Sequence, residues 1–359
     1  MAKKITMQQI ADHLGVSKFV VSKALSGKGG VNETTKERVI QAASQLGYFS
    51  QKNAYIRSPK AERPASKSGG KQSVIVLMPN IRFQTKESLY WGKIVEGISG
   101  SLEDMGLGMV IISEQSVDNF VHILNPDGIL GLIGVGQIST PLLLEVHRLG
   151  MPIVLVDMED PLIPSDTVFV NNMDAMAKLT NYLIGIGHRR LQFIGNDRFS
   201  RSFRDRHAGF RITLEEHGLN APAQDGLALQ LQELEKGDIE TEVKGWLSRK
   251  LKAKAMPTAL VCANDSIAVT VVQVLNELGL KVPSEVSVTG FDNIEDAMQN
   301  AVRLTTVHVP KEAMGRRAVQ KLLERIERPL EPMEKILLAG DIVYRDSSGA
   351  AADSLGEGE

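Results

Sequence analysis

From residue 73 onward, short apolar runs alternate with amphipathic segments of helical period. Continuous runs such as Val74–Met78 and Ile153–Val156 are typical of parallel strands buried on both faces. Strands that alternate with helices predict doubly wound α/β sheets. The ~270 residues up to about 346 exceed one typical lobe, so we expect two lobes. The other predicted strands are 108–112, 128–133, 191–194, 259–262 and 286–289.

The first 49 residues have a different pattern, which predicts three short helices. Thr6–Gln9 is a capping box that starts the first helix, and Gly15 ends it in a left-handed conformation. Ser17 can cap a second helix over about 18–25, and a third runs from about 32 to 46. Two helices joined by so short a turn predict a helix-turn-helix unit.

The second of these helices carries side chains suited to DNA. In a helix-turn-helix unit its first turn meets base edges in the major groove. Lys18 and Phe19 occupy that turn, and Lys23 lies one turn on. Lysine can donate to guanine or phosphate, and phenylalanine can contact a thymine methyl group. An ordinary three-helix bundle with a basic face would show the same pattern.

Charge separates the chain into two parts. The net charge is −2, but residues 1–70 carry +8 and the remainder −10. A basic module on an acidic body indicates a polyanion as partner of the first part. No apolar run approaches the ~18 residues of a membrane span, and the N-terminus lacks the apolar segment of a secretion signal. We therefore expect a cytoplasmic protein without a membrane partner.

Two segments lack any apolar periodicity. Residues 58–72 are rich in Pro, Gly, Ser and Lys, which predicts a flexible basic linker. Residues 347–359 are small, polar and acidic, which predicts a disordered tail. The expected organisation is a head over 1–57, this linker, and a body over 73–346.

The head resembles the lactose-repressor (LacI/GalR) family of transcriptional regulators. The similar segments are 5–17 (ITMQQIADHLGVS), 21–27 (VSKALSG), 31–39 (VNETTKERV) and 46–48 (LGY), in order and spacing. The resemblance implies a homodimer that binds a palindromic double-stranded DNA operator. Val20 and Lys23 depart from the family, which usually has Thr and often Arg there, so the preferred operator can differ. The implied DNA-binding residues of the head are Thr6, Ser17, Lys18, Phe19, Ser22, Lys23 and Asn32.

The hinge departs further from that family. In the family a short hinge helix places a Leu in the minor groove, where such wedges kink the duplex. The matching stretch is 51–57, and Arg57 stands where the Leu is expected. Ile56 could serve as a displaced wedge, or Arg57 could enter the groove electrostatically. A plain linker fits equally well.

The resemblance extends through the body. It implies a periplasmic-binding-protein-like (type I) fold whose chain crosses between the lobes three times, with a ligand in the cleft. The expected N-lobe covers 73–169 and 309–332, and the C-lobe covers 170–308 and 333–346. The segments that carry this resemblance are 149–157, 187–190, 263–265, 290–292, 304–307 and 315–319.

Candidate effector residues follow from strand ends, because ligands of α/β sheets lie beyond the carboxyl ends of the strands. Tyr90 and Trp91 offer aromatic faces for the C–H side of a sugar ring. Arg206 matches the family's effector-contacting arginine. Asp292 is favoured over Asp265, since an Asp at that junction often caps a helix. The full predicted set is Asn80, Tyr90, Trp91, Asp157, Arg206, Asn264, Asp265 and Asp292.

These observations favour a ligand-responsive repressor with a carbohydrate effector; purines and nucleosides are alternatives. A transport or chemotaxis receptor would share the body but would need export. An enzyme would need a catalytic cluster, and we predict no catalytic residue, metal site or cofactor. One cysteine and seven scattered histidines fit this expectation. Inducer or corepressor action, a protein corepressor, and a dimer or tetramer all stay open.

Overall fold

The computed structural model describes residues 7–26, 35, 39, 72–79, 88–113, 128–219, 228–231, 239–299 and 302–351. The chain divides into two compact units, residues 1–69 and 70–359, and each is described by itself.

The head contains the two predicted helices, α1 (Met7–Leu14) and α2 (Lys18–Ser26). Gly15 has φ +67°, so it ends α1 in the left-handed conformation as predicted. The amide of Val20 donates to Ser17 Oγ at 3.3 Å, which confirms Ser17 as a helix cap. Of the predicted third helix, Thr35 and Val39 are described, and both are helical. The hinge at 51–57 and the linker at 58–72 lie almost wholly outside the described residues.

The body is built on two six-stranded sheets. All strand pairs are parallel except that of β10 with β12. The first sheet has the order β11 (Lys335–Leu338), β5 (Asp166–Val170), β4 (Ile153–Val156), β3 (Ile129–Val135), β1 (Ser73–Leu77), β2 (Gly108–Ile112). The second has the order β12 (Asp341–Val343), β10 (Thr305–His308), β9 (Ser287–Asp292), β8 (Ala259–Cys262), β6 (Leu191–Gly195), β7 (Ala228–Gln230).

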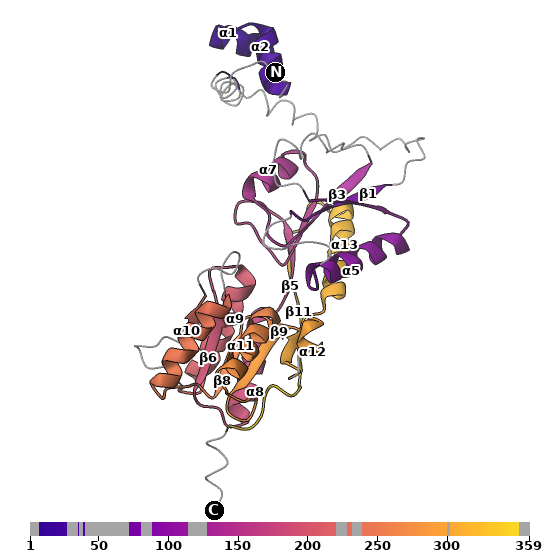
Figure 1. The fold of residues 1–359 in the computed structure, drawn as a ribbon. Helices are drawn as coiled ribbons and strands as arrows, with labels where there is room; N and C mark the ends of the chain where they lie inside the picture. The colour runs from indigo at the N-terminus through magenta and orange to yellow at the C-terminus, as the bar shows by residue number, and fades with distance from the viewer. Residues whose placement is uncertain are drawn as a thin grey trace, which may run out of the picture. The chain divides into compact units, whose positions relative to one another are not determined.

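Helices cover these sheets. Helix α7 lies on one face of the first sheet, and α5 and α13 lie on the other (Figure 1). Their apolar side chains pack onto these two faces. This layering is the predicted doubly wound α/β fold. The helices of the body are α5 (Trp91–Asp104), α7 (Thr140–Arg148), α8 (Asn172–Gly185), α9 (Arg201–Glu216), α10 (Ile239–Lys252), α11 (Asp265–Glu277), α12 (Asp296–Gln299) and α13 (Lys311–Glu327).

The chain crosses between the two sheets after β5, after β10 and after β11. The third crossing differs from the expected one, which divided the lobes at 332/333. Strand β11 pairs with β5 in the first sheet, so the crossing lies between Leu338 and Asp341. The predicted boundary was wrong because the position of β11 is set by its pairing with β5, which lies far earlier in the chain.

The predicted tail is also shorter than expected. Ser347 is fully buried, and its hydroxyl donates to the carbonyl of Val288 at 2.6 Å. The carbonyl of Gly349 lies 3.0 Å from His188 Nε2, and the amide of Ala351 donates to Ile186 O at 3.1 Å. Residues 347–351 therefore belong to the second lobe, because buried partners satisfy their polar groups despite an unpromising composition.

Candidate functional site

The exposed face of α2 carries the predicted DNA-contacting side chains. Phe19 is 67% exposed, which is unusual for a phenylalanine, and Lys18 is exposed beside it. The ammonium of Lys23 lies 5.1 Å from the Phe19 ring centroid. The sequence-predicted DNA contacts at Thr6, Asn32, Ile56 and Arg57, and the side chain of Ser22, lie outside the described residues.

Four of the predicted effector residues meet between the two sheets. Tyr90 precedes α5, and Asp157 follows β4, both in the first lobe. Arg206 lies on α9 and Asp292 ends β9, both in the second lobe. The Tyr90 hydroxyl donates to Asp157 Oδ2 at 3.2 Å, and Arg206 Nη2 lies 3.0 Å from Asp292 Oδ1. The Trp91 ring meets the Tyr90 ring edge-on, with centroids 4.8 Å apart.

Arg206 is held by its own lobe on several sides. Its side chain is 2% exposed, and its Nε donates to Asn172 Oδ1 at 2.8 Å. Its Nη1 donates to the carbonyl of Ala263 at 2.7 Å. The guanidinium also stacks on Phe291, 3.8 Å from the ring centroid. Much of the guanidinium is thus committed to the protein, which fixes its orientation before any ligand arrives.

Asp157 joins the two lobes. It receives a 2.5 Å hydrogen bond from the hydroxyl of Ser202, in the first turn of α9, besides that from Tyr90. Burial raises the pKa of Asp157 to about 6, against the hydrogen bond from Ser202 and the charge of Arg206, which lower it. Burial, and then the charge of Asp157, raise the pKa of Tyr90 well above its usual value. Tyr90 therefore stays protonated and remains a donor.

Asp292 is strained and incompletely bonded. It has φ +109°, and its neighbour Asn293 has φ +53°. Non-glycine residues held in such conformations cluster at ligand sites. Asp292 is 8% exposed, and no donor among the described residues makes an aligned hydrogen bond to its Oδ1. Burial raises the pKa of Asp292, and the charges of Arg206 and Lys311 oppose this rise. Arg206 Nη2 lies 3.0 Å from this Oδ1, so the two side chains form a buried ion pair whose hydrogen-bond alignment is imperfect.

The residues at the start of α11 have supporting hydrogen bonds. Asn264 Oδ1 caps this helix by accepting from the amide of Ile267 at 3.0 Å. Asp265 is fully buried and accepts from Thr306 Oγ1 at 2.6 Å and from the Ile294 amide at 3.0 Å. Burial raises the pKa of Asp265 to about 7, and the charge of Asp292 acts in the same direction. Asp265 therefore supports the segment after β9, and Asn264, not Asp265, is the cap. The predicted effector residue Asn80 lies outside the described residues.

Sequence reasoning missed three polar side chains at this site. Asn172 begins α8 and orients Arg206, and Ser202 binds Asp157. Lys311 begins α13, and its Nζ donates to the carbonyl of Asp292 at 2.5 Å. Each of the three lies in the first turn of a helix that starts at the interface of the lobes. That shared position, near a strand end, is the one signal in the sequence that could have indicated them.

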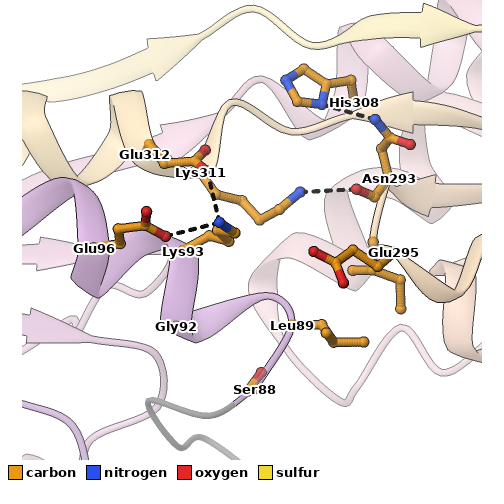
Figure 2. A pocket seen from close by; sticks show the side chains of 11 residues that line it. Ser88, Leu89, Gly92, Lys93, Glu96, Asn293, Glu295, His308, Lys311 and Glu312 are labelled. Atoms are coloured by element: carbon orange, nitrogen blue, oxygen red, sulfur yellow. Dashed lines mark hydrogen bonds and ion pairs between the residues drawn. The ribbon is translucent and has the colours of Figure 1, made fainter.

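A cavity of about 320 Å³ lies beside this group of residues. Figure 2 shows its walls, with Lys93 and Glu96 of α5 facing Asn293 and Glu295 of the second lobe. Lys311 extends along one wall toward Asn293. The cavity therefore lies between the lobes and reaches Asn293, the neighbour of Asp292, but its lining includes none of the predicted effector residues that the structure describes. Its lining is Ser88, Leu89, Gly92, Lys93, Glu96, Asn293, Ile294, Glu295, His308, Lys311 and Glu312.

The described residues support neither a metal site nor a membrane-spanning helix. Nowhere in that part of the chain do three or more His, Cys, Asp or Glu side chains gather as metal ligands would. None of the helices described there has the length and apolar character needed to cross a membrane.

Each of the two units matches a known protein family over part or most of its length. Residues 6–51 match the family described as "Bacterial regulatory proteins, lacI family", and residues 180–348 match "Periplasmic binding protein-like domain". The HTH-type transcriptional repressor PurR of Photorhabdus laumondii is 30% identical over 352 residues, which cover 95% of this chain and 96% of that protein. The HTH-type transcriptional regulator DegA of Bacillus subtilis is 26% identical over 355 residues, covering 96% and 98%.

Solved structures share the fold. A complex of the transcriptional regulator CelR with cellobiose matches with TM-score 0.68 and 21% identity, covering 96% of this chain and 99% of that one. The lac repressor dimer bound to operator and the anti-inducer ONPF matches with TM-score 0.65 and 21% identity, covering 97% and 100%. A ribose-bound regulator from Enterococcus faecium matches with TM-score 0.64 and 21% identity, covering 78% and 99%. The chain belongs to the lacI family of bacterial regulatory proteins, which are DNA-binding transcriptional regulators.

Proposed function

We propose that this chain is a repressor that binds a palindromic operator as a homodimer. A small-molecule effector raises or lowers its affinity for the operator. The effector, a carbohydrate, lies between the lobes against Arg206, Asp292, Tyr90, Trp91 and Asp157. Asn264 and Asn80 remain predicted contacts. The observation that carries this proposal is the meeting of Tyr90 and Asp157 with Arg206 and Asp292 between the lobes, where a strained, buried carboxylate lies beside an oriented arginine.

A carbohydrate suits the chemistry of these side chains. Asp157 and Asp292 can accept from sugar hydroxyls, and a remaining N–H of Arg206 can donate to a ring or hydroxyl oxygen. The Tyr90–Trp91 pair supplies an aromatic surface for the C–H face of a sugar ring. Complexes of CelR with cellobiose and of the Enterococcus faecium regulator with ribose support this class of effector.

The lobes offer a route from effector to operator. Asp157 and Ser202 bond across the two lobes, so a ligand that displaces or strengthens this contact changes the arrangement of the lobes. An effector alters operator affinity only as far as it binds the two arrangements unequally. In a dimer the two copies of α2 would enter successive major grooves, with half-sites about 34–36 Å apart.

Selection from a randomised duplex pool tests the DNA half of the proposal. We expect a symmetric motif, with Lys18, Phe19 and Lys23 on base edges or phosphates. The Lys23→Ala variant should bind the selected site more weakly and lower the salt slope of binding by about one. No symmetric enrichment in the absence or presence of sugars would contradict the repressor function.

A thermal-shift screen over mono- and disaccharides, followed by isothermal titration, tests the effector half. Cellobiose and ribose are the first two sugars to try. A sugar that binds should also change the affinity for the selected operator. Binding of purines or nucleosides with no response to any sugar would replace the carbohydrate by the alternative effector class.

A further inference from the structure

Lys311 is a buried cation at the N-terminus of a helix, where a positive charge is unfavourable. It is the first residue of α13 and is 5% exposed. A positive charge at a helix N-terminus opposes the helix dipole, and burial lowers the pKa of Lys311 against the charges of Asp292 and Asp265. A lysine retained there needs a compensating set of partners.

Those partners are main-chain carbonyls. The ammonium donates to Asp292 O at 2.5 Å, and longer contacts run to Val309 O at 3.3 Å and Asn293 O at 3.4 Å. Figure 2 shows the side chain of Lys311 reaching across to Asn293. Two of the three carbonyls thus belong to the consecutive left-handed residues that end β9, so Lys311 holds together the strained turn that presents Asp292.

The same lysine belongs to a helix of the other lobe. The N-terminal part of α13 packs closely against α5, and a Cβ placed on Gly315 would overlap the backbone at Ile94 and Ile98. The two helices are therefore in backbone contact. Tyr90 lies at the start of α5, and Lys311 Nζ is 5.7 Å from its ring centroid. Lys311 thus connects the Asp292 turn of the second lobe to the α5–α13 pair of the first.

We propose that Lys311 is a positioning residue, which fixes the Asp292 carboxylate for the effector and ties effector binding to the α5–α13 pair. The effect on the effector rests on the function proposed above, whereas the effect on the turn does not. A change of Lys311 should therefore be visible in the ligand-free protein.

The first test is a crystal structure of ligand-free Lys311→Met beside the wild type. Methionine keeps the apolar stem but has no ammonium, so the carbonyls of Asp292 and Asn293 lose their donor. We expect the turn to leave its left-handed conformation and Asp292 to move away from Arg206. An unchanged turn would overturn the proposal, whatever the effector proves to be.

Lys93→Met is the matched control. Lys93 lines the same cavity, but its Nζ contacts the carboxylates of Glu96 at 2.9 Å and Glu312 at 3.9 Å instead of main-chain carbonyls. We expect the Asp292 turn to be unchanged in this variant. A turn that relaxes equally in both variants would show that charge in the cavity, and not the position of Lys311, controls it.

The second test is isothermal titration with cellobiose and ribose as probes. Loss of a buried, charge-assisted contact should weaken binding of the sugar about 10- to 100-fold in Lys311→Met. If the turn relaxes but sugar affinity is unchanged, Asp292 is not an effector ligand and the positioning role fails. If neither probe nor any other sugar of the screen binds the wild type, the carbohydrate assignment is at fault, and the crystal structures still decide the role of Lys311.

The pH profile of sugar binding gives a readout that a purely structural role would not shift. Asp292 faces Arg206 from α9, Lys311 from α13, Asp265 from α11, and Asp157 with Tyr90 from the first lobe. Lys311 lowers the pKa of Asp292, so removing its charge should move the pH at which binding is lost upward. Lys93→Met should leave that midpoint in place, and an unshifted midpoint in Lys311→Met would count against the proposal.

Discussion

Among the described residues, each lobe buries one arginine–aspartate pair, and the two pairs are bonded very differently. In the first lobe Arg325 donates two hydrogen bonds to Asp166, from Nε to Oδ2 at 2.8 Å and from Nη2 to Oδ1 at 2.9 Å. The Glu334 amide adds a third hydrogen bond to Asp166, and Arg325 also donates to the carbonyls of Glu331 and Pro332. Asp166 is 0% exposed, so the pair is shielded from solvent, and both of its carboxylate oxygens accept hydrogen bonds.

The pair in the second lobe is left incomplete. Arg206 meets Asp292 through a single 3.0 Å approach, and Asp292 Oδ1 lacks an aligned donor among the described residues. Asp292 also has a strained backbone, whereas Asp166 lies in a regular strand. Burial of an ion pair is thus a poor guide to function by itself. The useful signal is a buried charge whose hydrogen-bonding capacity is not used up by the protein.

Arg325→Met should produce the largest loss of stability. It would leave Asp166 buried, with Lys321 Nζ at 3.8 Å as its nearest remaining cation. Breaking a buried pair from one side costs about 3–5 kcal/mol, so we expect a large drop in Tm by calorimetry. The control is Arg317→Met, whose partner Glu324 is half exposed and whose loss should cost at most about 1 kcal/mol. Equal, small shifts in both variants would contradict the distinction.

Arg206→Met should mainly abolish the response to effector. Its guanidinium is oriented by Asn172 and Ala263, and a charged hydrogen bond to ligand contributes up to about 3 kcal/mol, or roughly 100-fold in affinity. We expect isothermal titration to show that loss, while gel-shift assays show unchanged operator binding without effector. A variant with wild-type effector affinity would remove Arg206 from the site.

Asp292→Asn should lower the affinity for effector without lowering the stability of the fold. Burial raises the pKa of Asp292, which means that the folded chain disfavours its charge, and asparagine tolerates the left-handed backbone. We expect a higher Tm together with effector affinity reduced about tenfold, since a charged acceptor becomes a neutral one. A lower Tm would indicate that the charge of Asp292 holds the fold together as that of Asp166 does.

The smallest expected effect is a pH dependence of stability. The pKa of Asp157 is about 6 and that of Asp265 about 7, both above their unfolded value near 4. The folded chain therefore binds protons that the unfolded chain does not, and its stability rises as pH falls from about 8 to about 5. Asp157→Asn should flatten this rise between about pH 7 and pH 5 in thermal unfolding. A wild-type slope in that variant would show that Asp157 does not titrate in this range.

Local rules made the head predictable. Gly15 and Ser17 act on amides and dihedrals a few residues away, so their roles could be inferred from spacing alone. The same holds for the apolar strands of the body and for the position of Asp157 and Asp292 at strand ends. Strand β5 was not predicted because it begins with a charged residue, Asp166. The burial of Asp166 depends on Arg325, which lies 159 residues later in the chain.

The sequence by itself determined the helix-turn-helix head, the doubly wound lobes and four of the side chains that meet between them, since periodicity and strand ends are local properties. Only the tertiary structure decided that Lys311 holds the Asp292 turn, that Ser202 bonds across the lobes, and that β11 joins the first sheet. These contacts join residues brought together by three crossings between the sheets. No local pattern records such pairings, because the partner that satisfies a buried charge is chosen by the packing of the whole body.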